Sequence, residues 1–255
     1  MTALASKVAR LREFFHANPR VGLGFSGGVD SSYLLWAGKH AGAELVPYFV
    51  RSAFVPQFEA DDALRLADHV GVPAQVVPVD ILSHPMVAAN PADRCYHCKA
   101  EIFGTILRLA ADAGLPLVID GSNASDDAGD RPGMVALAEL QVRSPLREAG
   151  LTKAEIRELS RAAGLFTGGK PSYSCLATRI PTGRRITSEL LGRVEGAEQV
   201  LFAMGFSDLR VRVFGDLARL QLPTGALTEA AARADEIRAA LAPWFDGVLL
   251  DLEGR

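Results

Sequence analysis

The chain has 255 residues, of which 49% are apolar and 22% are charged, and its formal net charge is −3. The length suits one large or two small domains, and the apolar fraction excludes a disordered chain. A net charge near zero gives no electrostatic argument for nucleic-acid binding. The three cysteines, Cys95, Cys98 and Cys175, cannot all pair. This odd number excludes a disulfide scaffold and favours a reducing, cytoplasmic compartment.

The first twenty residues have the pattern of an amphipathic helix rather than of a signal peptide, because no apolar stretch leads to a small-residue cleavage site. No run of about 18 apolar residues occurs anywhere, so we expect no membrane span.

Segments typical of strands and helices alternate through the first two thirds of the chain. Strands are expected at residues 21–25, 45–50, 75–79 and 117–120. Helices are expected at residues 31–40, 58–70 and 99–113, and a capping box of Thr152 and Glu155 begins another that stops at Gly164. This alternation predicts an α/β, Rossmann-like fold, with a parallel sheet and helices on both faces. Such sheets bind ligands at the carboxyl ends of their strands.

The pattern changes after Pro181. We expect a helix at residues 188–204, followed by a hairpin of residues 209–214 and 217–222. We then expect an Ala-rich helix at 228–241, with Thr228 as N-cap, and a last strand at 247–252. They predict a small C-terminal α+β domain, so the domains are residues 1–180 and 181–255.

The first glycine-rich turn joins a strand to a helix and reads Ser26-Gly27-Gly28-Val29-Asp30-Ser31-Ser32. Adjacent glycines, a helix N-terminus and the hydroxyls of Ser31 and Ser32 fit a phosphate, and the alternative is a capped turn without a ligand. Asp30 either caps the helix or orients Mg²⁺, and we favour Mg²⁺ because a carboxylate beside phosphates needs a bridging cation.

A second glycine-bearing loop, residues 120–127, follows the fourth expected strand, and residues 130–133 come soon after it. Its Gly121 and Asn123 belong either to a polar surface turn or to the other wall of the same nucleotide site.

Residues 95–98 read Cys-Tyr-His-Cys and are expected in a loop before a helix that begins near Lys99. Four interpretations compete: structural thiols, a CxxC redox pair, a zinc site completed by His97 or another histidine, and an iron–sulfur cluster. Three thiolates, from Cys95, Cys98 and Cys175, would leave one iron of a [4Fe–4S] cluster open to bind a sulfide.

The first loop carries the pattern SGGxDS and resembles the PP-loop ATP pyrophosphatases. The segments 93–99, 120–133, 144–146, 150–153 and 175–181 extend the resemblance, from about residue 5 to about residue 250, to the LarE family of sulfur transferases. The resemblance implies an adenine nucleotide alpha hydrolase-like fold, ATP and Mg²⁺ as cofactors, and a homo-oligomer, expected to be a hexamer. It implies that the nucleotide is bound by the following residues: Ser26, Gly27, Gly28, Asp30, Ser31, Ser32, Gly121 and Asn123.

The family acts in the synthesis of the nickel-pincer nucleotide cofactor. Its acceptor is pyridinium-3,5-biscarboxylic acid mononucleotide: ATP adenylates a carboxylate, and sulfur displaces AMP to give a thiocarboxylate. In one branch a single cysteine, which matches Cys175, gives up its own sulfur. A second branch has cysteines that match Cys95, Cys98 and Cys175, and a [4Fe–4S] cluster carries the sulfide. The three-cysteine pattern places this chain in the second branch, and the sequence does not indicate the sulfide source.

An anionic acceptor needs nearby cations, and the candidates are Lys99, Arg179, Arg210 and Arg212. Arg210 and Arg212 alternate along a strand and share one face, which is either solvated or an anion site. We favour the anion site because the resembling family has Arg-x-Arg there. Glu195 and Glu198 are either helix-surface residues or catalytic ones, and we favour the surface of the helix.

Three other functions remain open. An ammonia-using ligase like NAD synthetase needs no thiolates, so the cysteines argue against it. The near-neutral charge argues against a tRNA-thiolating enzyme. The complete loop and the cysteine trio argue against a nucleotide sensor without catalysis.

Overall fold

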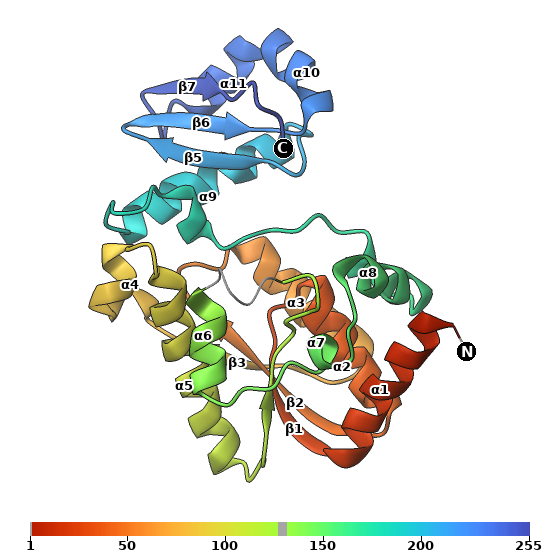
Figure 1. Ribbon diagram of the computed structural model, residues 1–255. Coiled ribbons are helices and arrows are strands. Elements are labelled where there is room, and N and C mark those ends of the chain that lie inside the picture. Colours follow the sequence, from red (N-terminus) through yellow and green to blue (C-terminus); the bar gives the residue numbers. More distant parts are fainter. Residues whose placement is uncertain (1, 127–131) are drawn as a thin grey trace. The chain divides into compact units, whose positions relative to one another are not determined.

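The computed structural model describes residues 2–126 and 132–255, which form two compact units (Figure 1). The first unit consists of Met1–Ser52, Gln57–Val79 and Asp93–Lys170, and the second of Ala53–Pro56, Asp80–Ala92 and Pro171–Arg255. Each unit is described by itself. Within the described ranges, no helix has the length and hydropathy needed to cross a membrane.

The first unit is built on a parallel sheet of four strands, as the sequence predicts. The strands are β1 (Arg20–Gly24), β2 (Glu44–Arg51), β3 (Gln75–Pro78) and β4 (Val118–Ile119). Their spatial order is β3-β2-β1-β4, and every pairing is parallel. This is a Rossmann-like order, and its direction reverses between β1 and β4. In open α/β sheets the ligand crevice lies at that reversal, beyond the carboxyl ends of the strands.

Helices cover both faces of this sheet. They are α1 (Ala3–Ala17), α2 (Val29–His40), α3 (Gln57–Val70), α5 (Arg94–Asp112), α6 (Pro132–Glu139), α7 (Pro145–Glu148) and α8 (Lys153–Ala162), with a short 3₁₀ turn, η2 (Phe166–Gly168). Helices α5 and α6 pack on one face, and α2 with its neighbours α1, α3 and α7 packs on the other (Figure 1). The capping box at Thr152 is confirmed, because its side chain and that of Glu155 each cap the other's backbone.

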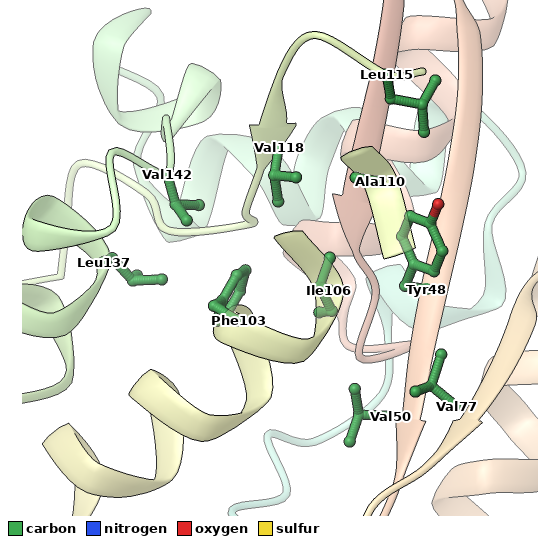
Figure 2. Packing of buried hydrophobic residues seen from close by; sticks show 10 residues of the cluster. All are labelled: Tyr48, Val50, Val77, Phe103, Ile106, Ala110, Leu115, Val118, Leu137 and Val142. Carbon is green, nitrogen blue, oxygen red and sulfur yellow. The ribbon is translucent and has the colours of Figure 1, made fainter. Parts of the chain in front are cut away.

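The core between α5 and the sheet explains the glycines of β1. Figure 2 shows this layer, which is formed by Tyr48, Val50, Val77, Phe103, Ile106, Ala110, Leu115, Val118, Leu137 and Val142. A Cβ at Gly24 would lie 2.6 Å from the ring of Phe103. Glycine therefore lets α5 approach β1 closely, which fixes the helix against the strand that leads into the first loop.

The second unit contains a three-stranded sheet with helices. Its strands are β5 (Arg210–Phe214), β6 (Leu217–Gln221) and β7 (Gly247–Leu250), its helices are α4 (Pro85–Ala89), α9 (Ser188–Ala203), α10 (Leu227–Ala232) and α11 (Ala234–Leu241), and its 3₁₀ turns are η1 (Ile81–Ser83), η3 (Leu176–Arg179) and η4 (Thr224–Ala226). Strands β5 and β6 pair antiparallel, which confirms the predicted hairpin, and β7 adds parallel to β6.

The prediction of a single Ala-rich helix at residues 228–241 is wrong. The segment forms two helices, α10 and α11, which separate at Arg233 (φ −103°, ψ 23°), and the N-cap of α10 is Ala226 rather than Thr228. The guanidinium of Arg233 donates to the carbonyl of Met204 at 3.0 Å. This anchor is a tertiary contact, so the run of good helix formers does not reveal the break.

The second unit begins earlier than the predicted domain of residues 181–255 and includes two segments from the first half of the chain. Asn90 explains why one of them belongs there. Its side-chain amide donates to the carbonyls of Ile180, Pro181 and Arg184 at 3.3, 2.9 and 3.2 Å. These hydrogen bonds attach residues 80–92 to the chain that leads into α9.

Candidate functional site

The glycine-rich loop leaves the carboxyl end of β1 and becomes the first turn of α2. Gly27 has a left-handed backbone (φ +72°), and a Cβ there would lie 2.4 Å from the Cβ of Ala63, so only glycine fits. Gly28 is the N-cap of α2, and in the described part of the chain no side chain caps this helix. The first-turn N–H groups and the positive end of the helix dipole are therefore available to an anion.

Three serine hydroxyls surround this turn. Ser26 Oγ and Ser31 Oγ lie 3.1 Å apart, and Ser31 Oγ donates to the carbonyl of Gly28 at 3.2 Å. Ser32 is fully buried, and its Oγ has no hydrogen-bond partner among the described residues. An unsatisfied buried hydroxyl costs about 1–3 kcal/mol. A ligand oxygen that accepted from it would remove this cost.

Asp30 has one engaged and one unengaged carboxylate oxygen. Oδ2 forms an ion pair with Nζ of Lys153 at 2.5 Å, whereas Oδ1 is buried and has no hydrogen-bond partner within the described ranges. Burial raises the pKa of Asp30, and the hydrogen bond and charge of Lys153 oppose this shift. A spare buried carboxylate oxygen is the kind of ligand that Mg²⁺ prefers, so the residues present fit this ion.

Lys153 is a site residue that the sequence did not single out. The capping box places it at the first position of α8, but only the packing of α8 on α2 brings its ammonium to Asp30. The sequence signal that could have identified Lys153 is its place in the segment 150–153. This segment is part of the family resemblance, which implies no role for Lys153.

Gly121 brings the second loop against the first. A Cβ at Gly121 would lie 2.9 Å from the backbone nitrogen of Ser31, so the two loops touch at the first turn of α2. Asp120 is buried just before it and accepts from the hydroxyl of Ser144 at 2.6 Å. The two predicted glycine loops therefore meet at the point where the strand order reverses.

Asn123 is buried in the second loop, where its side chain closes a local turn. Its Oδ1 accepts from the backbone N–H of Ser125 at 2.8 Å. Its backbone N–H donates to Asp126 at 3.0 Å. The predicted residues 127, 130 and 131 lie outside the described residues.

Lys99 extends from α5 toward the same edge of the sheet. Its Nζ lies 3.9 Å from Oδ2 of Asp120, and its aliphatic chain packs beside Gly133. The structure therefore places this predicted acceptor cation next to the second loop.

Cys95 and Cys98 lie within α5, so the expectation of a loop at residues 95–98 is wrong. The helix begins at Arg94, five residues earlier than predicted, and Asp93 is its N-cap. The first turn is anchored by Tyr96, whose hydroxyl donates to Glu139 of α6 at 2.6 Å.

The helical spacing of Cys95 and Cys98 puts both thiols on one face. Cys95 is exposed, and the guanidinium of Arg94 donates to its sulfur at 3.6 Å. Cys95 is exposed and Cys98 is partly buried, and their spacing on one face of the helix fits two ligands of a single iron–sulfur cluster.

Cys175 is exposed in the second unit, where it is the N-cap of η3. The backbone N–H of Leu176 donates to the carbonyl of Phe54 at 3.0 Å, and the hydroxyl of Thr178 donates to the carbonyl of Cys175 at 2.8 Å. Cys175 is therefore an exposed residue in a segment whose backbone is held by hydrogen bonds.

Arg179 is buried directly behind this loop. Its Nε lies 2.8 Å from Oε1 of Glu198, and the residue is 1% exposed. Glu198 is also 1% exposed, so the expectation that it lies on the helix surface is wrong. The reason is tertiary, because Arg179 and the hydroxyl of Tyr173 both satisfy the Glu198 carboxylate in the interior.

Arg210 and Arg212 point toward the same loop. Arg210 donates to the carbonyl of Ser172, and Arg212 donates to the carbonyl of Thr178 at 2.6 Å. Burial and the charge of Arg179 lower the pKa of Arg210 to about 10, so it remains a cation at neutral pH. Their predicted role toward an anionic acceptor stays a prediction.

The predicted residues thus fall into two groups. The first unit brings the two glycine loops, Asp30 and Lys99 to one edge of its sheet and places Cys95 and Cys98 on α5. The second unit gathers Cys175 with Arg179, Arg210 and Arg212. Within either unit, the described residues contain no group of three His, Cys, Asp or Glu side chains placed to hold a metal ion.

Comparison with known proteins identifies the family. No family model matches the chain. An uncharacterized protein of Synechocystis sp. is 38% identical over 86% of this chain and 82% of its own, and an uncharacterized protein of Methanocaldococcus jannaschii is 27% identical over 83% and 81%. The pyridinium-3,5-bisthiocarboxylic acid mononucleotide synthase of Lactiplantibacillus plantarum is 32% identical over 100% of this chain and 93% of its own. Because this similarity extends over the whole chain, the protein belongs to the family of that synthase, the LarE family.

Proposed function

We propose that the protein is an ATP-dependent sulfur transferase that converts the carboxylates of pyridinium-3,5-biscarboxylic acid mononucleotide to thiocarboxylates. The observation that carries this proposal is the meeting of the two glycine loops at the strand reversal, where Ser32 Oγ and Asp30 Oδ1 are buried without protein partners in the described chain. The similarity to the Lactiplantibacillus relative, a pyridinium-3,5-bisthiocarboxylic acid mononucleotide synthase, supports the choice of product.

The first loop would bind the β- and γ-phosphates of ATP. The N–H groups at the N-terminus of α2 donate to phosphate oxygens, and Lys153 adds a positive charge. Asp30 would hold Mg²⁺ through its spare oxygen, which neutralises the leaving pyrophosphate. A substrate carboxylate oxygen then attacks the α-phosphorus of ATP. The bond from this phosphorus to the oxygen that bridges it to the β-phosphorus breaks, so pyrophosphate leaves and an acyl adenylate forms.

In the second step sulfur attacks the acyl carbon and AMP leaves with the carboxylate oxygen. Cys95, Cys98 and Cys175 would hold a [4Fe–4S] cluster, which supplies a transferable sulfide when bound. Lys99, beside the second loop, would attract the anionic acceptor. Two cycles would complete the bis-thio product.

The substrate class is tested by pyrophosphate release from ATP. We expect release with the pyridinium biscarboxylate mononucleotide and none above background with unmodified tRNA or ammonia. Release that depends on tRNA would instead identify a tRNA-thiolating enzyme, and release with ammonia would identify an amide ligase.

The sulfur source is tested by anaerobic reconstitution with iron and sulfide. We expect about four irons per chain and an absorption band near 400 nm that Cys98→Ala diminishes. A protein without iron in which Cys175 loses the mass of its sulfur during turnover would show sacrificial transfer. The homo-hexamer implied by the resemblance is checked by light scattering.

A further inference from the structure

The loop that carries Cys175 is held by guanidinium groups that lie behind it. Arg179 Nη1 donates to the carbonyl of Ser174 at 2.9 Å, to the hydroxyl of Ser174 at 2.7 Å, to the carbonyl of Cys175 at 3.3 Å and to the hydroxyl of Thr178 at 2.9 Å. Each of these acceptors lies within four residues of the thiol.

The rest of the Arg179 side chain faces Glu198. Nε donates to Oε1 at 2.8 Å and Nη2 to Oε2 at 3.3 Å, so every nitrogen of the guanidinium is engaged. Glu198 Oε1 also accepts from the backbone N–H of Val211 in β5 at 2.9 Å. The carboxylate therefore ties the loop, through Arg179, to the sheet of the second unit.

Two further arginines complete the arrangement. Arg210 donates to the carbonyl of Ser172 and Arg212 to that of Thr178, one at each end of the loop. The guanidinium groups of Arg179 and Arg210 also lie over the ring of Tyr173, 4.4 and 4.8 Å from its centroid.

We propose that Arg179, Arg210 and Arg212 are positioning residues, which fix the loop of residues 172–178 and so hold the exposed Cys175 in place. The contacts alone support the conclusion that the loop is held in place. The effect of this positioning on sulfur transfer rests on the proposed function. A planar fork with five N–H donors can bind several carbonyls and a carboxylate together, which a lysine ammonium cannot do.

This role differs from a direct contact of Arg179 with an anionic acceptor. Arg179 is 1% exposed, and each of its three guanidinium nitrogens contacts a protein oxygen, so a ligand reaches it only if the loop opens. Burying the Arg179–Glu198 ion pair costs desolvation free energy. The hydrogen bonds that the two side chains make in the interior offset this cost and hold the loop.

The experiment is hydrogen exchange of the full-length protein, followed at the amides of Leu176 and Thr178 in the loop and of Ile180 just after it. We expect Arg179→Lys to accelerate exchange there by about tenfold or more, because it keeps the charge but loses the fork. Arg193→Met is the matched control, since Arg193 also donates to a backbone carbonyl of the second unit, that of Trp244. It should leave the loop amides unchanged.

A second variant guards against an uncompensated buried charge. Arg179→Met/Glu198→Gln removes both charges and keeps an amide oxygen for Val211, and the loop amides should again exchange faster while those of β6 do not. Loop exchange equal to that of the unmodified protein in both variants would overturn the proposal.

The catalytic consequence is read separately. In a working sulfur-transfer assay, Arg179→Lys should lower kcat about tenfold or more with little change in the KM for ATP, whose loop lies in the first unit. A raised KM for the acceptor with unchanged loop exchange would favour direct anion binding instead. A chain with no sulfur-transfer activity at all would refute the proposed function but not the exchange result.

Discussion

Gly27 is the residue at which the loop after β1 tolerates least change. A non-glycine residue in left-handed geometry costs about 1–2 kcal/mol. At Gly27 an added Cβ would also overlap Ala63 at 2.4 Å, whereas at Gly42, with a similar φ of +81°, it would meet nothing within 4 Å. The two positions therefore have similar left-handed backbones and differ in the atoms that an added Cβ would meet.

We expect Gly27→Ala to lower the free energy of unfolding by about 1–3 kcal/mol more than Gly42→Ala does, because of overpacking. Urea denaturation of both variants measures the difference. Equal losses would mean that α3 moves aside and that the loop is not fixed by this contact.

The ion pair of Asp30 and Lys153 leads to a second prediction at the scale of single residues. Lys153→Met removes the ion pair with Asp30 and, with it, a positive charge beside the loop. We expect the Kd for ATP with Mg²⁺ to rise about tenfold, the cost of one hydrogen bond to a charged group. Lys39→Met, at the opposite end of α2, is the control and should bind ATP normally in calorimetry.

At the scale of elements, the start of α8 is held by more than its capping box. Lys7 of α1 forms an ion pair with Glu155 at 2.7 Å, and this contact, with the Thr152 backbone hydrogen bond, lowers the pKa of Glu155 to about 2. A lowered pKa in the folded state means that the ionised carboxylate stabilises the fold above its ordinary pKa of 4.5. That stabilisation is lost as the pH falls from about 4.5 toward 2.

We therefore expect Glu155→Gln to reduce the free energy of unfolding by about 1 kcal/mol at pH 7 and by less at pH 3. Urea denaturation at the two pH values measures this change. Glu158→Gln, exposed on the same helix, should show no such pH dependence. A gap that stays constant between pH 7 and pH 3 would contradict the assigned pKa shift.

The start of α5 shows where element-scale prediction fails. Residues 94–98 contain no strong helix breaker, but Cys, Tyr and His are only average helix formers, so the sequence pattern placed the start at Lys99. The extra turn is stabilised by the hydrogen bond from Tyr96 to Glu139 of α6, and these two residues are 43 positions apart in the sequence. This turn gives Cys95 and Cys98 their helical spacing.

At the scale of the whole molecule, the two units are not continuous stretches of chain. Asn90 joins residues 80–92 to the second unit through three carbonyls, and the backbone N–H of Gly183 donates back to Asn90 at 2.8 Å. A local pattern cannot predict such a connection, because its partners are about 90 residues apart.

We expect Asn90→Ala to cost about 1–3 kcal/mol, because buried carbonyls lose their donor. Hydrogen exchange should accelerate at the amides of Gly183 and Ile186 and remain unchanged in the strands of the first unit. Asn18→Ala, which removes one amide contact at the end of α1, is the control. Faster exchange confined to β1 and β2 would contradict the assignment of residues 80–92 to the second unit.

The sequence alone determined the parallel α/β sheet, the two glycine loops at its carboxyl edge, the hairpin and the capping box, because these depend on local periodicity, turn chemistry and caps. The tertiary structure decided which side chains those elements bring together. It placed Lys153 on Asp30, buried Glu198 against Arg179, and divided the Ala-rich segment at Arg233. Each of these depends on contacts between residues 19 to 123 positions apart, and the free energy of such contacts comes from burial and geometry that local patterns do not contain.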